Sequence, residues 1–541
     1  MPSALNDAQP PRFNFTSAID HDLHQDQHLH HAIYYTTATL LFFCAWFFQS
    51  ARYKTSNLIP YYRASRIKWM FSADALIRDS YRKFRDTVYE VKSTEGLRTI
   101  IPPTLVGELK GLPEDVLSAK TAVSEAMLSD YTQLSADSHA DTLTLLLRTK
   151  ATQNLPRMVP HLKEELEYII SNEFPQSEDW TPFKVQPFMV RAVSRLSGRA
   201  FVGAQLCRRE EWMEVSINFA ITAFIAVTKL QFFPPWMRSA AQYLVPELKT
   251  IRKDLAKAQD MLRPLIEERL AERDESSRSE PDDFIQWLSD ALPEDQKRDF
   301  YIQAKMQLLL SASSIHTTSN LTTDCIYDLA VHQDMQEILR QEAIAVFGED
   351  GIGWEERDSI SRLKKMDSFI KESQRLSGNI TSFIRKVMKP ITLSDGTHLP
   401  PGTNLLTPLA GVAVDERFFP DPEIFDGLRF WKLRQLQSPT LSPSPSPSTS
   451  TSSTLSHPLP NASKYQLTSL GDTSMNFGLG RHACPGRFFA AQEIKLILAY
   501  LLLHYDIKLP EGATRPKPVT FMMTRAPSQT AEILFRRRKY A

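Results

Sequence analysis

The chain has 541 residues, of which 42% are hydrophobic and 23% charged, and its formal net charge is zero. This is ordinary globular composition, and without a basic excess it does not indicate a nucleic-acid binder. The four cysteines, Cys44, Cys207, Cys325 and Cys484, are far apart and include no CxxC pair, which excludes a zinc ribbon and a disulfide framework. We therefore expect a reduced protein that mostly faces the cytosol.

An apolar segment without charges occupies residues 32–48. Its 17 residues are at the short end for a bilayer span, and a buried core helix is the alternative interpretation. Residues 1–31 carry four Asp and one Arg, whereas Arg and Lys follow the segment, so the positive-inside rule places the C-terminal bulk in the cytosol. No basic leader or cleavage site indicates a cleaved signal peptide. We expect a single-pass anchor with a lumenal tail at 1–31 and a linker at 49–66.

The predicted lumenal tail holds two features of its own. The sequon that begins at Asn14 is a glycosylation acceptor if it reaches the lumen. Five of the 13 histidines lie within residues 21–31, a composition that can bind metal. The tail has no structured scaffold, so we favour an unstructured tract over a metal site.

Helical periodicity dominates the middle of the chain, after a stretch of mixed short patterns at 66–150. The apolar turn LQFFPPWM at 230–237 has two interpretations. It is either a loop packed on the core or a lip that dips into a membrane over a substrate entrance. The predicted helices are 155–173, 182–230, 245–273, 295–331, 332–347 and 359–376.

The pattern changes after Gly378. Short alternating runs, punctuated by SDGT at 394–397 and PPGT at 400–403, predict hairpin turns, and residues 520–538 also predict strands. In residues 438–460, 13 of 23 positions are Ser or Thr and six are Pro, so this segment cannot bury a core and is predicted to be a disordered surface insertion. The fold class expected is mainly α with small β-sheets.

The stretch FGLGRHACPG, residues 477–486, places Cys484 in a glycine-rich loop directly before a predicted helix. A metal-binding thiolate needs a lowered pKa, and Arg481, His482 and the helix N-terminus favour an anionic sulfur. Glycines leave room for a bound group because they lack a Cβ atom. A nucleophilic cysteine with His482 as its base and an inert buried cysteine are the two alternatives.

The spacing of Phe477, Gly480, Cys484 and Gly486 resembles the haem-binding signature of the cytochrome P-450 superfamily, the haem-thiolate monooxygenases. The resemblance implies the cytochrome P-450 fold and haem b, with Cys484 as the axial ligand whose thiolate favours cleavage of the O–O bond. The family often has Arg two residues before the cysteine, as a haem propionate partner. This chain has His482 there, and the resemblance gives His482 that role.

Glu372 and Arg375 lie at i and i+3 on a predicted helix, so their side chains share a face. By themselves they indicate only an ordinary helix ion pair. The resemblance implies instead an internal, structural triad with Arg429 that stabilises the core behind the haem. This chain departs from the family in having Leu428 where Pro commonly precedes that arginine.

Two more arginines are candidate propionate partners. Arg385 matches the family's usual arginine after the Glu372 helix, with a surface arginine as the alternative, and Arg148 is a second candidate for the same role. The haem-binding residues that the resemblance implies are Cys484, Phe477, Gly478, Arg481, His482, Gly486, Arg385 and Arg148.

The long predicted helix at 295–331 contains a segment that the family uses for oxygen activation. Ser313 to Thr317 occupy the places of a small residue, an acid and a threonine, with His316 in place of the acid. Oxygen reduction consumes protons, and a helix hydroxyl beside a titratable group can relay them through water. The resemblance gives this catalytic role to Thr317 and His316. The alternative for Thr317 is a hydroxyl bonded back to its own helix.

The resemblance covers nearly all of the chain except 1–31 and 438–460. It implies a cytosolic catalytic domain at 67–541, on an anchor in the endoplasmic reticulum membrane. The enzyme oxidises C–H bonds with O2 and with electrons from NADPH, passed on by NADPH-cytochrome P-450 reductase, with cytochrome b5 as a second candidate donor. The expected substrate is a lipophilic secondary metabolite, terpenoid or indole-diterpenoid. Its candidate lining residues, for each of which core packing is the alternative, are Leu309, Ser313, Ile380, Thr381, Met522 and Met523.

Two rival functions stay open. One keeps the haem but catalyses desaturation, rearrangement or ring coupling of an alkaloid or polyketide. The other is an inactive haem-binding membrane module. The intact residues Cys484, Glu372, Arg375 and Thr317 argue against the second rival.

Overall fold

The computed structural model describes most of the chain after residue 58. The predicted tail, anchor and Ser/Pro-rich insertion lie outside the described residues, as does most of the predicted linker. Residues 228–244 belong to a compact unit separate from that of the other described residues, and each unit is considered by itself. The described ranges are 59–272, 281–348, 352–355, 358–437 and 462–539.

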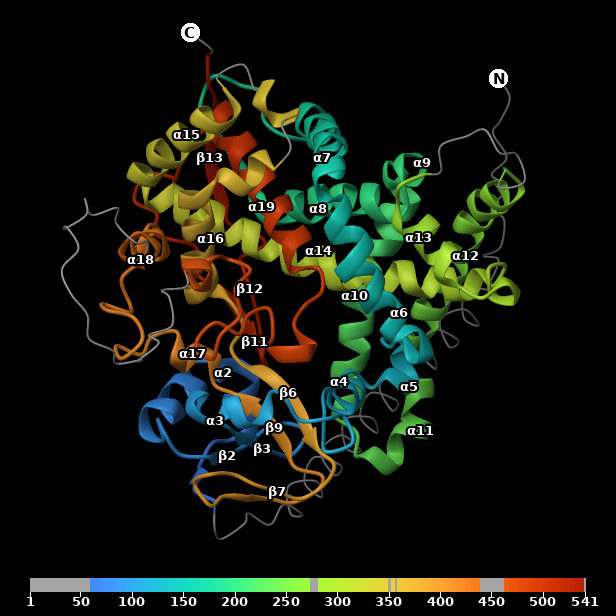
Figure 1. The fold of residues 1–541 in the computed structure, drawn as a ribbon, viewed down its shortest axis with the longest axis vertical. Coiled ribbons are helices and arrows are strands. Elements are labelled where there is room, and N and C mark those ends of the chain that lie inside the picture. Colours follow the sequence, from blue (N-terminus) through green and yellow to red (C-terminus); the bar gives the residue numbers. More distant parts are fainter. Residues whose placement is uncertain (1–58, 273–280, 349–351, 356–357, 438–461, 540–541) are drawn as a thin grey trace, which may run out of the picture. The chain divides into compact units, whose positions relative to one another are not determined.

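Helix α14 (Phe300–Val331) is the central helix of the larger unit. It begins five residues later than predicted because Asp299 caps it, accepting hydrogen bonds from the N–H groups of Tyr301 and Ile302. Apolar residues occur all around the helix, as expected for a helix buried on most sides. Figure 1 shows it crossing the helical region. Its main neighbours are α8 (Val185–Phe201), α12 (Pro246–Glu272), α16 (Lys364–Ser377) and α19 (Arg487–His504).

The helices predicted at 155–173, 245–273 and 332–347 are confirmed, and that at 359–376 is confirmed from Lys364 after a 3-10 turn at Ser359–Arg362. The helix predicted at 182–230 is wrong at its start, where Thr181–Lys184 form strand β5, and it breaks twice, at 202–203 and at 208–209. The segment predicted as a single helix at 182–230 divides at Gly203, whose φ of 79° is left-handed and whose added Cβ would lie 2.7 Å from Asp283 Oδ2. The remaining helices of this unit are α2 (Arg66–Lys83), α3 (Pro103–Leu109), α4 (Ala119–Met127), α5 (Ser129–Thr132), α6 (Ala140–Leu146), α7 (Thr152–Glu173), α9 (Ala204–Cys207), α10 (Glu210–Gln231, which runs into the smaller unit), α13 (Phe284–Ala291), α15 (Gln333–Phe347), α17 (Leu409–Val412) and α18 (Arg429–Gln437).

A six-stranded sheet lies in the lower part of Figure 1, in the strand order β1-β2-β3-β9-β6-β4. The β1–β2 and β3–β9 pairs are parallel and the others antiparallel. Tyr61 and Tyr62 form β1 and Arg66 begins α2, so the last residues predicted as linker belong to the folded unit. The strands are β1 (Tyr61–Tyr62), β2 (Tyr89–Lys92), β3 (Leu97–Ile100), β4 (Leu117–Ser118), β6 (Ser382–Val387) and β9 (Asn404–Thr407).

Of the two predicted hairpin turns, one is confirmed and the other is wrong. The SDGT turn joins the antiparallel strands β7 (Ile391–Thr392) and β8 (His398–Leu399), with Gly396 at a φ of 84°, and is confirmed. The hairpin predicted at PPGT is wrong, because β9 after this turn pairs with β3 and β6 and not with β8. The Gly402 N–H donates to Val387 O, which draws the turn toward the end of β6.

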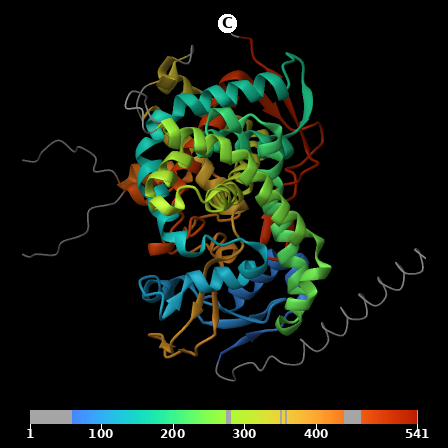
Figure 2. The same ribbon diagram turned by 90° about the vertical axis from the view of Figure 1, so that its right-hand side faces the viewer.

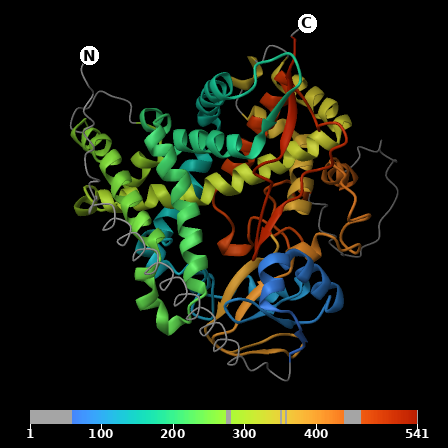
Figure 3. The same ribbon diagram turned by 180° about the vertical axis from the view of Figure 1, so that it is seen from behind.

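The strands predicted at the C-terminus are confirmed. Strand β13 (Glu532–Arg537) pairs antiparallel with both β10 (Tyr505–Lys508) and β5 (Thr181–Lys184). In Figures 2 and 3 the red C-terminal strand lies beside the teal strand β5. Strands β11 (Val519–Phe521) and β12 (Thr524–Ala526) form a separate hairpin.

The smaller unit contains the apolar turn at 230–237, a 3-10 turn at Pro235–Met237 and α11 (Arg238–Ala241). Trp236 is 75% exposed, whereas Leu230 and Pro234 are buried, so the turn has one exposed aromatic residue beside residues that are packed. Among the described residues, α10 is the one helix long and apolar enough to cross a membrane by length and composition. Half of its apolar window is buried.

The carboxylate of Glu372 holds the segment before α18 against α16. Arg375 donates to both carboxyl oxygens at 2.7 and 2.8 Å, and Arg429 Nε lies 3.1 and 3.2 Å from them, so the three side chains form one internal ion-paired cluster. The guanidiniums also donate to main-chain carbonyl oxygens of that segment, among them Pro422 O and Pro420 O. Glu372 is fully buried, so each charge depends on its partners.

Replacing Glu372 with Ala should lower the free energy of unfolding by about 3–5 kcal/mol, because two buried guanidiniums lose their carboxylate. Denaturant unfolding followed by circular dichroism measures this loss. The matched control is Glu167→Ala, which breaks the partly exposed Lys163–Glu167 pair and should cost less than about 1 kcal/mol. Equal losses in the two variants would contradict a structural role for the triad.

A second buried carboxyl group, Glu493 of α19, has no charged partner among the described residues. Its side chain is fully buried, and its one hydrogen-bond partner is the hydroxyl of Ser197 on α8. Burial raises the pKa of Glu493 to about 8, although the Ser197 hydrogen bond acts in the opposite direction. The folded protein therefore holds this carboxyl group in its neutral form at pH 7.

The raised pKa predicts a specific dependence of stability on pH. Between pH 4.5 and 8 the unfolded chain ionises Glu493 and the folded chain does not, so its contribution to stability falls as pH rises, by about 1.4 kcal/mol per pH unit. Glu493→Gln is neutral in both states and should remove this dependence. The measurement is the difference in unfolding free energy between wild type and variant from pH 5 to 8. The exposed Glu511→Gln serves as control, and a flat difference for Glu493→Gln would refute the raised pKa.

Candidate active site

The cysteine loop is closed by its own backbone. The Cys484 N–H donates to Phe477 O at 2.8 Å, and a 3-10 turn spans Gly480–His482. Gly478 and Gly480 have φ of 71° and 66°, and a Cβ on either would lie within 3 Å of a main-chain oxygen. These two glycines are therefore required by the turn itself. Gly486, by contrast, has nothing within 4 Å of an added Cβ and leaves space beside the cysteine.

The sequence indicated a lowered pKa for the Cys484 thiol, and the structure gives the opposite direction. Burial raises the pKa of the Cys484 thiol, and this outweighs the N–H groups of Gly486 and Arg487 and the charge of Arg487, which act to lower it. The helix N-terminus is present, since α19 begins at Arg487. A bound cation would supply the charge that makes the thiolate stable here.

Basic side chains gather around the loop. Arg148 lies in a π-helical turn at Leu147–Ala151, and its Nη2 donates to Arg481 O at 2.6 Å. Arg481 in turn donates to Gly111 O at 3.1 Å. The structure thus brings together Arg148 and the cysteine loop, which are more than 300 residues apart in the sequence.

His482 forms a close contact with Glu114, with Nε2 lying 2.6 Å from Oε1. Burial lowers the pKa of His482, and the charges of Arg385, Arg481 and Arg148 lower it further, while Glu114 raises it. The net direction is downward, so at pH 7 a neutral imidazole donates its N–H to the carboxylate. His482 is consequently a hydrogen-bond donor in this site and not a fixed cation.

A β-bulge aims Arg385 at the same region. The pairing of β6 with β9 shifts register between Ser382 and Arg385, and Phe383 has a left-handed φ of 53°. The Arg385 guanidinium stacks on the Phe383 ring at 4.2 Å, and its one hydrogen bond among the described residues is to Ile384 O. Burial lowers the pKa of Arg385 to about 10, and the charge of Glu114 offsets only part of this effect.

This arrangement fits the haem that the sequence resemblance implies. Four arginines and one carboxylate, Glu114, act on the loop, and Arg487 Nε is buried without a partner among the described residues. The region therefore carries uncompensated positive charge. The two propionate groups of a haem are anions that would neutralise it, and the sulfur of Cys484 is the axial donor expected for its iron.

The predicted oxygen-activation segment lies in the middle of α14. Thr317 and Ser313 are exposed in the middle of a mostly buried helix, and the Thr317 hydroxyl donates to Ser313 O at 2.7 Å. His316 points elsewhere, with its Nε2 lying 3.1 Å from Ile217 O of α10. Because a carbonyl oxygen only accepts, Nε2 carries the proton, and burial lowers the pKa of His316. His316 is therefore neutral and connects α10 to α14.

The candidate lining residues divide into two groups. Ser313 is exposed, and Leu309, Met522 and Met523 are partly exposed. Thr381 is mostly buried, and its hydroxyl lies 3.1 Å from the sulfur of Met523. Ile380 is fully buried in a core cluster with Trp69 and Leu76, which is the core-packing alternative for that residue.

The sequence reasoning missed a hydrogen-bonded chain behind the oxygen-activation segment. Ser197 Oγ lies 2.8 Å from Ser314 Oγ and 3.1 Å from Glu493 Oε1. The sequence contained one signal, an acidic residue inside the strongly apolar helix that follows the cysteine loop. Ser197 is 296 residues from Glu493 and 117 residues from Ser314, so only the fold reveals these contacts.

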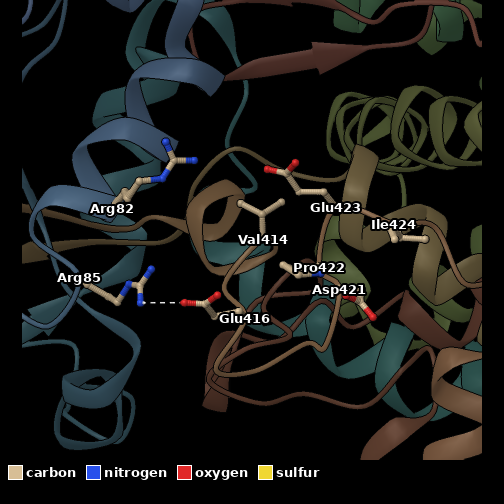
Figure 4. Close-up of a pocket in the computed structure, with 8 residues that line it drawn as sticks. All are labelled: Arg82, Arg85, Val414, Glu416, Asp421, Pro422, Glu423 and Ile424. Carbon is tan, nitrogen blue, oxygen red and sulfur yellow. Dashed lines mark ion pairs between the residues drawn. The ribbon is translucent and has the colours of Figure 1, made fainter.

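The structure also contains a pocket of about 460 Å³ that is lined by none of the residues predicted for the active site. It is formed between the end of α2 and residues 414–424, and Figure 4 shows Arg85 paired with Glu416 at 3.9 Å. Its lining is mostly charged and includes no predicted site residue. We do not assign it to the candidate active site.

Comparison with known proteins is consistent with this geometry. The family model described as Cytochrome P450 matches residues 135–535. This range includes the cysteine loop, the oxygen-activation segment and the triad.

Several fungal proteins are similar over most of their length. Cytochrome P450 monooxygenase AN1598 of Emericella nidulans is 35% identical over 88% of this chain and 86% of its own. Cytochrome P450 monooxygenase braC of Annulohypoxylon truncatum is 34% identical over 87% and 90%. Ent-kaurene oxidase of Gibberella intermedia is 31% identical over 87% and 85%. With its helical fold, its cysteine loop and these matches, the chain belongs to the cytochrome P450 family of monooxygenases, which hold a haem through a thiolate and receive electrons from a reductase.

Proposed function

We propose that this enzyme oxidises C–H bonds of a lipophilic secondary metabolite, with Cys484 as the axial haem ligand. The overall reaction converts R–H, O2, two electrons and two protons into R–OH and water. The observation that carries the proposal is the glycine-closed Cys484 loop, set in an excess of arginine charge that suits two propionates. When bound, the haem supplies the oxygen-activating redox chemistry.

The residues around the loop bind and orient the haem in this proposal. Arg385 and Arg148 pair with propionates, and His482 and Arg481 complete the donor set. Phe477, whose carbonyl oxygen already closes the loop, packs near the sulfur. Gly478 keeps the turn, and Gly486 keeps the adjacent space open.

Thr317 is the proposed hydroxyl for proton delivery. Its exposure in the middle of α14 supports this role. Its hydroxyl proton is donated to Ser313 O, the bond to its own helix that is the alternative for this residue, so the proposed delivery requires the hydroxyl group to turn away from that carbonyl oxygen. His316 supports the site in a different way from the acid of the family pattern. Its bond to Ile217 O positions α10, a helix with the exposed apolar residues Ile221, Phe224 and Ile225, against α14.

A terpenoid substrate is supported by two observations. A relative over most of this chain is an ent-kaurene oxidase, and the partly exposed lining residues Leu309, Met522 and Met523 are apolar. An indole-diterpenoid has similar chemistry and is part of the same proposal. Desaturation or ring coupling without oxygen in the product is the second candidate, and incorporation of labelled oxygen separates the two.

The setting proposed is the endoplasmic reticulum membrane, with residues 32–48 as the anchor and the catalytic domain in the cytosol. The charge difference across that segment supports this orientation. The exposed Trp236, on a turn with two prolines, supports a lip that dips into membrane lipid. NADPH-cytochrome P-450 reductase is the proposed electron donor, with cytochrome b5 as a second donor and Asn14 as a lumenal glycosylation site.

Replacing Cys484 with Ala should abolish the thiolate-type, red-shifted Soret band of the reduced protein under carbon monoxide, because the axial sulfur is lost. Absorption spectra of wild type and variant, reduced and exposed to carbon monoxide, test this. Cys207→Ala is the control, since Cys207 is buried beside α8 and should leave the band unchanged. A red-shifted band in Cys484→Ala would refute the ligand assignment.

Replacing Arg385 with Leu should lower haem content and haem affinity, because a propionate loses its buried partner. We expect a loss of about 1.5–3 kcal/mol in haem binding, the range for hydrogen bonds to charged groups. Haem titration of the apoprotein measures it. The neighbouring Lys386→Leu, which removes a pair with Glu125 outside the site, is the matched control, and equal affinities would argue against Arg385.

Purified enzyme supplied with reductase, NADPH and ent-kaurene should yield a product that carries one oxygen atom from labelled O2. Mass spectrometry detects the incorporated atom. A product formed with equal use of NADPH and O2 but without the label would favour the desaturation or coupling alternative. Turnover of unrelated polyketides in preference to diterpenes would contradict the terpenoid proposal.

A further inference from the structure

The hairpin of strands β11 and β12 ends in the two-residue turn Met522–Met523, and both methionines are candidate lining residues. A two-residue hairpin turn needs a positive φ at its first residue, where glycine is favoured. Met522 occupies this position with a φ of 51°, so its backbone is strained. A bulky side chain at a strained position indicates that the turn does more than connect two strands.

Arg525 of β12 fixes one side of the hairpin. Its guanidinium forms an ion pair with Asp74 of α2, and its Nη1 donates to Leu376 O near the end of α16 at 2.6 Å. The Arg525 side chain is only 6% exposed. Burial lowers its pKa, while the charge of Asp74 acts to raise it. One buried guanidinium therefore joins the hairpin to two helices, and Figure 1 shows the hairpin between α2 and the helical region that contains α14.

Arg515 fixes the other side, in the loop that leads to β11. Its Nη2 lies 3.1 Å from Asp324 Oδ1, and its Nε contacts Asp328, which lies one turn further along α14. Both aspartates are 4% exposed. Asp324 follows Thr317 by seven residues, about two turns of the same helix. Arg515 is thus paired with the helix that carries the oxygen-activation segment.

Apolar burial does little to fix the segment that contains the turn. None of the apolar side chains in residues 511–526 is fully buried. The turn itself is held by the Met522 N–H, which donates to Met70 O at 2.6 Å, and by the Thr381 hydroxyl, which lies 3.1 Å from the Met523 sulfur. The charged side chains on either side of the turn are therefore its main attachment to the helices.

We propose that Arg525 and Arg515 are positioning residues for the substrate, because they hold the Met522–Met523 turn at one place relative to the oxygen-activation segment. This inference rests on the proposed function. Arg515 binds α14 itself, so the turn and Thr317 keep a fixed spacing. The carbon that is oxidised is the one that the lining holds at the reacting position, and a displacement of about 1 Å is enough to change that choice.

An ion pair with a structural role alone is available for comparison. Arg269 of α12 contacts Asp283 at the start of α13, with distances of 2.6 and 2.7 Å. The two side chains are 12% and 6% exposed, so this pair is also buried. It joins two helices and contacts none of the candidate lining residues. Arg269→Met is therefore the matched control for the loss of a buried ion pair.

The test compares Arg525→Met and Arg515→Met with Arg269→Met in the full-length haem protein. Lys517→Met is a second control, because Lys517 is exposed in the same loop as Arg515. The Soret band reports the affinity for imidazole and for an imidazole that carries a long aryl group. Imidazole by itself binds iron without reaching the lining, whereas the aryl group fills the substrate space. Amide hydrogen exchange of residues 519–526 and the position of the oxygen in the ent-kaurene product are also measured.

We expect Arg525→Met and Arg515→Met to bind the aryl-imidazole about tenfold more weakly and imidazole with wild-type affinity. Amide exchange in residues 519–526 should be about tenfold faster. A larger share of the ent-kaurene product should carry oxygen at carbons other than the main one. Arg269→Met should unfold at a lower denaturant concentration but match wild type in all these readouts, and Lys517→Met should match wild type throughout.

A wild-type ratio of the two affinities in both Arg525→Met and Arg515→Met would overturn the inference, as would an equal change in Arg269→Met. If Arg525→Met fails to fold, Asp74→Asn decides, since Asp74 is partly exposed and its replacement removes one charge only. It should also weaken binding of the aryl-imidazole alone.

A wild-type holoprotein without the red-shifted carbon monoxide band would instead overturn the proposed function. Absence of turnover with ent-kaurene would contradict the terpenoid proposal, while the imidazole affinities would still decide the role of the two arginines. The failures are therefore distinguishable.

Discussion

The buried carboxylate of Glu372 is the interaction on which the rest of the site depends. It neutralises Arg375 and Arg429 at once, and their remaining N–H groups bind main-chain oxygens before α18. Helix α16 is thereby held in place, and β6 with Arg385 begins only five residues after its end. A buried ion pair of this kind is poor evidence of net stabilisation, but it specifies one arrangement because each alternative leaves a charge unpaired.

In the candidate active site, unlike at Glu372, buried charged groups lack partners of opposite charge. Around Cys484 the positive groups exceed the negative ones, and burial keeps the thiol pKa high and the Arg385 pKa low. Both shifts have the same cause, since each charged form is removed from water without a partner. A haem would relieve both, its iron at the sulfur and its propionates at the arginines. The protein therefore carries buried positive charge without a partner, and binding of the cofactor would neutralise it.

Side-chain hydrogen bonds connect helix α14 to α10 and, through Ser197 of α8, to α19. His316 connects α14 to α10, and Ser314 connects it through Ser197 to Glu493 on α19, the helix that begins beside Cys484. Thr317 and Ser313 remain exposed between these connections. The same helix therefore contacts α10 and presents two exposed hydroxyl groups in its middle turns.

The sequence by itself determined the helices, the C-terminal strands, the cysteine loop and the Glu372–Arg375 pair. These features depend on local spacing, which periodicity and motifs record directly. It did not determine that β9 leaves the PPGT turn for the large sheet, or that burial outweighs the helix N-terminus at Cys484. Those outcomes depend on which distant strands and side chains surround a residue. The orientation of His316 and the chain from Glu493 to Ser314 were likewise decided only by the tertiary structure, because hydrogen-bond partners up to 296 residues apart meet through packing alone.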